Sequence, residues 1–140
     1  MAIRNQTVRR QDYSDLDLDF IAHPTTGDVV KKTGIDAIKR SVRNLVLTNF
    51  YDRPFRPFIG SSAQKILFDN INPLTATFLR NAITEVIRNF EPRVKINDDP
   101  NFGVIVQVDP DNNGYNVQIN FTIVNRGEPA VINLFLERIR

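Results

Sequence analysis

Acidic side chains are the groups in this chain that could break a bond in a substrate, because the sequence has no cysteine and only one histidine. Hydrolysis of a glycosidic bond requires two carboxyl groups, one of which an apolar pocket keeps protonated. Glu85 and Glu91 are the candidates that lie near each other in the sequence. The guanidinium of Arg93 would lower the pKa of Glu91, which is the wrong direction for a proton donor. We therefore expect no catalytic residues and no enzymatic activity.

Two other patterns resemble metal sites. His23 has no second histidine and no cysteine or glutamate at ligand spacing, so we expect it to be a loop residue. Residues 109–114 match the first six positions of a calcium-binding EF-hand loop, but the twelfth position is Asn120 instead of the glutamate that binds the ion. Asn113-Gly114 is instead typical of a hairpin turn. We expect no metal and no cofactor.

The stretch Phe90-Glu91-Pro92-Arg93 combines two opposite charges with a proline, and it lies where a helical pattern stops. Pro92 removes a backbone donor and disfavours helical dihedral angles at Glu91, so we expect the helix to end at Phe90. Two interpretations stay open: a helix terminator with solvated charges, or a docking corner for another protein. Apolar residues before the corner recur at helical spacing and predict one stripe, which comprises Phe78, Leu79, Ala82, Ile83, Val86, Ile87 and Phe90.

Three helices are expected ahead of this corner. The first would cover residues 34–49 and place its basic side chains outward. Ser61 and Gln64 have capping-box spacing for a short second helix. Asn72 and the proline after it offer a cap and a favourable first turn for the third and longest helix. Between the first two helices, the prolines of residues 53–60 favour an extended corner.

Beyond residue 93 the apolar period changes to two, which predicts strands. Short strands are expected at residues 94–97 and 104–108, and a longer strand with one polar face at 115–123. The polar face and the short last strand suggest an antiparallel sheet with an accessible edge, whose unpaired backbone groups could accept a strand from another chain. That last strand would contain Ile132, Leu134 and Leu136.

The N-terminal residues follow a different pattern. Leu16, Leu18 and Phe20 alternate with aspartates, which predicts a strand-like extended arm over residues 1–34. A single domain is expected over residues 35–140, because a chain of this length can bury one self-sufficient core. The predicted fold class is therefore α+β, with an extended arm followed by three N-terminal helices packed on a small antiparallel sheet that has an accessible edge strand.

The formal net charge of +2 is too small to indicate a nucleic-acid partner. Residues 31–58 are rich in lysine and arginine, but a solvated helix surface explains such a cluster more simply than nucleic-acid binding does. No apolar run has the length of a signal-peptide core or a membrane span, so we expect no membrane partner and a cytosolic site of synthesis. The arm, by contrast, is acidic and contains Asp12, Asp15, Asp17 and Asp19.

A series of short motifs follows the chain: Ala37-Ile38-Lys39-Arg40-Ser41-Val42, Arg53-Pro54-Phe55, Gly60-Ser61, Leu67-Phe68, Pro73-Leu74-Thr75-Ala76 and Glu91-Pro92-Arg93. In this combination and order they resemble the baseplate wedge subunits of contractile phage tails, the sheath-initiator family. The resemblance covers about residues 35–138. The family also includes a baseplate protein of bacterial type VI secretion, and some of its members carry a lysozyme-like label.

The resemblance implies a structural protein of the virion tail, assembled in the host cytoplasm. Its last strand would offer an edge to strands of the first sheath ring. Glu91, Pro92 and Arg93 would dock on the helical core bundle of the baseplate wedge, with Arg53 nearby, and six copies would encircle the tail. The equivalent type VI secretion component is the first alternative, and a lysozyme-like peptidoglycan hydrolase is the second.

Overall fold

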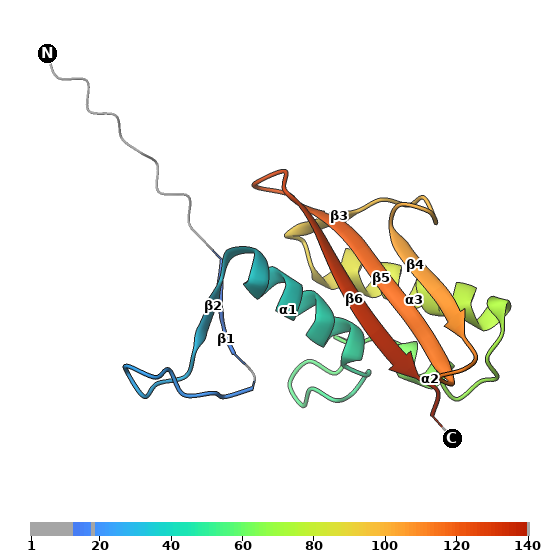
Figure 1. Cartoon of the computed structure of the whole chain (residues 1–140), viewed down its shortest axis with the longest axis horizontal. Helices are drawn as coiled ribbons and strands as arrows, with labels where there is room; N and C mark the ends of the chain where they lie inside the picture. The colour runs from blue at the N-terminus through green and yellow to red at the C-terminus, as the bar shows by residue number, and fades with distance from the viewer. Residues whose placement is uncertain (1–12, 18, 140) are drawn as a thin grey trace, which may run out of the picture. The chain divides into compact units, whose positions relative to one another are not determined.

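The computed structural model describes residues 13–17 and 19–139. The chain divides into two compact units, one up to Ala37 and one from Ile38 onward, and each is described by itself. Figure 1 shows the helices and strands in chain order. Of the predicted arm, residues 1–12 and Leu18 lie outside the described residues.

The described part of the first unit is a short antiparallel hairpin. Strand β1 (Ser14–Leu16) pairs with β2 (Lys31–Thr33), and a bridge between Ala22 and Val29 closes the chain that connects them. Phe20, between the strands, has a φ of +50°, a left-handed conformation that side chains of this size rarely adopt. The chain therefore turns back where the alternating pattern predicted an extended arm.

Three helices follow the hairpin. Helix α1 (Gly34–Leu47) begins in the first unit and continues in the second, α2 (Ala63–Ile66) is a single turn, and α3 (Pro73–Phe90) is the longest. The start of α3 is capped as predicted, because the side-chain oxygen of Asn72 accepts a hydrogen bond from the backbone N–H of Thr75 at 2.7 Å. The predicted end of this helix at residue 90 is also confirmed.

Strand β5 (Gly114–Ile123) is the centre of a four-stranded antiparallel sheet. Strand β6 (Pro129–Glu137) pairs with one side of β5 over nearly its whole length. On the other side, β3 (Val94–Ile96) lies beside the C-terminal end of β5 and β4 (Val104–Asp109) lies beside its N-terminal end. The loop of residues 97–103 thus interrupts what would otherwise be one continuous strand.

The core of the second unit lies between this sheet and the helices. Helix α3 packs against β3 and β4, and it runs behind the sheet in Figure 1. Alternate residues of β5 and β6 are buried toward the helices while their neighbours are exposed. Phe78, which the helical spacing predicted to lie on one apolar stripe with Leu79 and Ile83, is 52% exposed, whereas those two residues are fully buried. The largest fully buried side chains are Tyr115, Ile38, Leu79, Ile83, Ile87, Ile119, Ile123, Val42 and Val117.

The predicted architecture of three N-terminal helices on one small antiparallel sheet is wrong. The described residues form two sheets with six strands, two of which precede the first helix, and α2 has only four residues. The predicted capping box is absent from α2. Ser61 Oγ accepts a hydrogen bond from the Ala63 N–H at 2.9 Å, and Gln64 Oε1 accepts one from Asn49. Strand β2 reads Lys-Lys-Thr, which carries no apolar alternation and so gave no strand signal.

Candidate functional site

Glu91 is the C-cap residue of α3, and its carboxylate is almost completely buried, with 3% of the residue exposed. Oε1 accepts a hydrogen bond from Arg93 Nε at 2.6 Å, and Oε2 accepts one from Arg93 Nη2 at 2.7 Å. Ser41 Oγ on α1 donates a third hydrogen bond, to Oε2, at 2.6 Å. The bidentate pair with arginine is a strong charge-assisted geometry. This corner therefore ties α1 to the end of α3 and to the residue that precedes β3.

The contacts of Glu91 set its ionisation. Burial raises the pKa of this carboxyl group, but the hydrogen bonds from Arg93 and Ser41 and the positive charge of Arg93 outweigh burial, so the pKa lies below its ordinary value. Glu91 is consequently a carboxylate at neutral pH. Because donors of its own chain occupy both oxygens, this carboxylate has little capacity left for another protein.

Pro92 and Arg93 are the parts of the corner that reach the surface. Pro92 is exposed, and the Arg93 side chain is 28% exposed. Since Glu91 holds the guanidinium through Nε and Nη2, it fixes the direction in which Arg93 points. A partner would meet Pro92 and the exposed part of Arg93, and Glu91 would position them. The docking role of these three residues stays a prediction.

Arg53, the fourth residue predicted for docking, lies on the exposed loop of residues 50–60 between α1 and α2. The second partner of Glu91 is Ser41, which sequence reasoning did not single out as a site residue. The sequence did contain a signal for Ser41, because this hydroxyl lies on a helix whose inward positions are otherwise apolar. The two residues are 50 positions apart, so spacing alone could not pair them.

Strand β6 is an edge strand, because among the described strands it pairs only with β5. The predicted edge residues Ile132, Leu134 and Leu136 are 6 to 8% exposed and contribute their side chains to the core. In an antiparallel ladder the N–H and C=O of one residue point to the same neighbour and alternate along the strand. Arg138 donates its N–H to Asn113 O at 2.9 Å, so the even-numbered residues of β6 bond to β5.

The open backbone edge of β6 therefore belongs to its odd-numbered residues. Their side chains are exposed too, with Val131 at 45% and Phe135 at 47%. At the C-terminal end this edge is closed, because Ile139 donates its N–H to Leu67 O at 3.0 Å. An added strand would bond to Val131, Asn133, Phe135 and Glu137, while the predicted residues hold β6 on the core. Acceptance of a strand by this edge stays a prediction.

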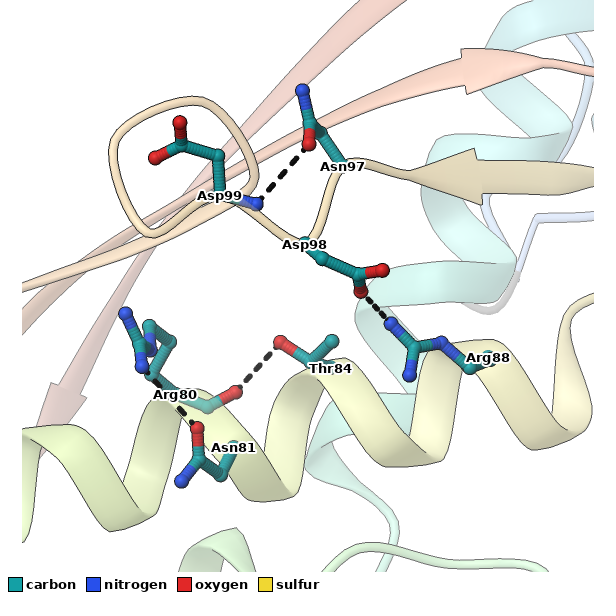
Figure 2. Close-up of polar contacts among 7 residues, drawn as sticks. All are labelled: Arg80, Asn81, Thr84, Arg88, Asn97, Asp98 and Asp99. Atoms are coloured by element: carbon teal, nitrogen blue, oxygen red, sulfur yellow. Dashed lines mark hydrogen bonds and ion pairs between the residues drawn. The ribbon is translucent and has the colours of Figure 1, made fainter.

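A polar recess of about 420 Å³ lies between α3 and the loop that follows β3. Figure 2 shows the ion pair that crosses it, from Arg88 on the helix to Asp98 on the loop. Glu85 lines the recess and is exposed, whereas Glu91 is not among the lining residues. The two glutamates considered for glycoside hydrolysis therefore do not face this cavity together.

The segment that resembles a calcium loop is a hairpin, as predicted. Asp109 pairs with Gly114 across the turn, and its carboxylate accepts hydrogen bonds from the side chains of Asn112 and Asn116. These bonds, with that from Asn112 foremost, lower the pKa of Asp109. Within the described residues, no group of three or more histidine, cysteine, aspartate or glutamate side chains is placed to hold a metal ion.

The family model described as baseplate wedge protein gp25 matches residues 32–127. The chain belongs to the gp25 family of baseplate wedge proteins. The resemblance predicted from the sequence motifs is thereby confirmed. Baseplate wedge protein gp25 of Enterobacteria phage T4 is 35% identical over 82 residues, which cover 59% of this chain and 61% of the T4 protein. The match thus spans about three-fifths of the length of that curated relative.

Two solved structures share the fold of this gp25-family chain. A crystal structure of a tail-lysozyme candidate from Geobacter sulfurreducens has a TM-score of 0.65 and 18% identity, and covers 74% of this chain and 89% of that chain. The sixfold-symmetrised cryo-EM structure of the anti-feeding prophage baseplate has a TM-score of 0.60 and 22% identity, and covers 92% and 88%. At these identities the likeness shows the fold alone. None of the helices in the described part of the chain could span a bilayer, given their length and polarity.

Proposed function

We propose that this gp25-family protein is a structural component of a contractile-tail baseplate in the virion, and that it works by holding other proteins. The family match over residues 32–127 carries this proposal. The T4 relative is named a baseplate wedge protein, and the anti-feeding prophage assembly is a baseplate with sixfold symmetry. In the proposal six copies encircle the tail, each with a wedge on one side and the first sheath ring on the other.

The Glu91 corner is the proposed contact with the core bundle of the wedge. Its guanidinium is held by two hydrogen bonds to Glu91, so little side-chain freedom is lost when a partner binds. Pro92 restricts the backbone beside it. A planar arginine presented in this way suits a carboxylate or a row of carbonyl oxygens at the end of a helix.

Co-purification with wedge proteins tests this contact. The double variant Glu91→Ala with Arg93→Ala removes both charges together, so no unpaired charge is left buried in the corner. Arg88→Ala, which removes an exposed arginine of α3, is the matched control. We expect the double variant to lose the wedge proteins and the control to retain them. A folded double variant that co-purifies as the wild type does would refute docking through the corner.

The open edge of β6 is the proposed template for sheath assembly. Each backbone hydrogen bond to an added strand contributes about 0.5 to 1.5 kcal/mol, so one junction is weak. Six junctions around a ring act together, which raises the effective affinity without any new contact. Sheath polymerisation would therefore begin on a completed ring and not on single wedges.

Asn133→Pro tests the template directly, because it removes an N–H that points away from β5 and leaves the ladder within the sheet complete. Asn133→Ala keeps that N–H and serves as the control. We expect wedges to form with both variants, and sheath to nucleate only with the alanine variant. Normal sheath on particles that carry the proline variant would exclude β6 as the template.

Peptidoglycan hydrolysis, suggested by the name of the Geobacter structure, has less support. A general acid must keep its proton near neutral pH. The pKa of Glu91 is lowered instead, and its carboxylate accepts two hydrogen bonds from the positively charged guanidinium of Arg93. We expect purified protein to leave the turbidity of a cell-wall suspension unchanged. Clearing that disappears with Glu85→Gln or Glu91→Gln would establish hydrolysis instead.

A further inference from the structure

The loop of residues 50–60, called here the aromatic loop, exposes large apolar side chains in the second unit. Tyr51 is 78% exposed, Phe55 97% and Phe58 75%. Arg53 and Arg56 lie between these aromatic residues and are exposed as well. Aromatic residues and arginine are the types that contribute most to binding at protein interfaces. The composition of this loop is therefore that of a binding surface.

The aromatic loop has a defined backbone conformation. A bridge between Asn49 and Ser61 closes its base, and the Tyr51 N–H donates to Pro57 O at 2.9 Å. Gly60 is packed so tightly that an added Cβ would lie 2.5 Å from the backbone of Asn49. A recess of about 420 Å³ adjoins the loop and is lined in part by Tyr51, Phe68 and Lys65. Because these contacts already fix its backbone, the loop itself would lose little conformational entropy when a partner binds.

The hairpin of the first unit, residues 13–33 without Leu18, has the complementary character. Its exposed apolar side chains are Leu16 at 56%, Phe20 at 68% and Ile21 at 61%. The exposed charged residues of the hairpin are Asp15, Asp19, Asp28 and Lys31, so acidic groups are in excess. The fourth aspartate, Asp17, is buried and paired with Lys32 at 3.4 Å. The hairpin thus offers apolar residues beside an excess of acidic groups. The aromatic loop offers them beside an excess of basic groups, because Arg53 and Arg56, with Lys65 next to the loop, outnumber the exposed Asp52.

Both surfaces also hold an aromatic residue in a strained backbone conformation. Phe20 has a φ of +50° and Tyr51 a φ of +72°. A left-handed conformation is unfavourable for such residues and is concentrated at positions that bind ligands or partners. Asn113, the remaining non-glycine residue with positive φ in the described chain, lies in a hairpin turn where asparagine is favoured.

We propose that the hairpin of one copy binds the aromatic loop of a neighbouring copy, head to tail. The exposed aspartates of the hairpin would face Arg53, Arg56 and Lys65, and an apolar residue such as Phe20 would fill the recess beside Tyr51. A head-to-tail contact of this kind joins successive copies and closes into a ring when the rotation between them allows it. The inference goes beyond wedge docking and strand acceptance, since it concerns contacts between identical chains.

Charge-reversal variants of the purified protein test this contact by sedimentation velocity at low ionic strength. One variant carries Asp15→Lys with Asp28→Lys, and the other carries Arg53→Glu with Arg56→Glu. Each alone places like charges at the contact, and we expect self-association about tenfold weaker than in the wild type. Mixing the two variants restores opposite charges only between different chains, so the mixture should associate as the wild type does.

One further variant and a folding control complete this experiment. Phe55→Ala changes no charge and should also weaken association, while circular dichroism checks that every variant folds. A wild-type chain that stays monomeric at high concentration in low salt would overturn the proposal. So would a mixture that fails to restore association, which would indicate binding within one chain or to a different protein. Because only the purified chain is used, such a failure leaves wedge docking and sheath templating untouched.

Discussion

Two regions of the second unit place an arginine beside a proline, and they differ in what holds that arginine. Arg93 follows Pro92 and is bonded twice by the buried carboxylate of Glu91. Arg53 precedes Pro54 on the aromatic loop. Backbone hydrogen bonds hold the conformation of this loop, and the side chain of Arg53 is exposed. An arginine beside a proline is thus held in place at residues 92–93 and exposed at residues 53–54. The difference arises because the buried carboxylate of Glu91 lies within hydrogen-bonding distance of Arg93.

Loss of the acid should have the largest effect on stability. Glu91→Ala removes three hydrogen bonds and leaves the partly buried guanidinium of Arg93 without its carboxylate, so we expect a loss of about 2 to 3 kcal/mol in the free energy of unfolding. Urea denaturation followed by circular dichroism measures it. Glu85→Ala, at an exposed position of the same helix, should cost less than about 0.5 kcal/mol. Equal losses for the two variants would mean that Glu91 does not brace the corner.

The aromatic loop should depend on backbone packing at its base. In Gly60→Ala the new Cβ would meet backbone atoms of Asn49 and Phe50 at 2.5 and 2.6 Å, so we expect a loss of about 1 to 3 kcal/mol. In Gly127→Ala the Cβ meets nothing within 4 Å, and only the positive φ opposes it, at about 1 kcal/mol. Thermal unfolding of both variants checks the order. If Gly60→Ala is as stable as the wild type, the backbone at the base of the loop can shift to accommodate the new Cβ at little cost.

The corner should also give stability a dependence on pH that the loop does not. Because folding lowers the pKa of Glu91, the folded protein binds fewer protons than the unfolded chain just below the unfolded value of about 4.5. The contribution of Glu91 is complete above that pH and is lost as the pH falls through the folded pKa. We therefore expect the stability difference between wild type and Glu91→Gln to shrink in acid. A difference that is constant from neutral pH to acid would contradict the ionised pair.

The smallest effect is expected on the surface of the aromatic loop. Phe55 is 97% exposed, so Phe55→Ala should change the free energy of unfolding by less than about 0.5 kcal/mol. Urea denaturation of Phe55→Ala and of Glu91→Ala under the same conditions compares their losses in the free energy of unfolding. A loss above about 1 kcal/mol would show that Phe55 packs on its own chain, and that the loop is part of the fold and not a surface for partners.

The elements that sequence predicted well are those with local signals. The cap at Asn72, the end of α3 before Pro92 and the hairpin after Asp109 each depend on residues within a few positions, and each is present. The alternation in β5 also predicted its buried and exposed faces, because a strand between a core and solvent keeps a period of two.

The features that sequence missed depend on distant residues or lack a pattern. The bond from Ser41 to Glu91 joins residues that only the fold brings together. Strand β2 is polar, so its pairing with β1 leaves no periodic trace. The backbone N–H and C=O groups of the odd-numbered residues of β6 point away from β5. This direction follows from the hydrogen-bond register between the two strands, which the periodicity of the side chains does not reveal.

A cryo-EM map of the baseplate with its first sheath ring, at a resolution that traces main chain, would show what lies beside β6 and beside the Glu91 corner. We expect a sheath strand beside β6, hydrogen-bonded to Val131, Asn133 and Phe135, with Arg93 against the wedge bundle. A map in which β6 faces solvent or a protein other than sheath, with the Glu91 corner away from the wedge, would contradict this expectation.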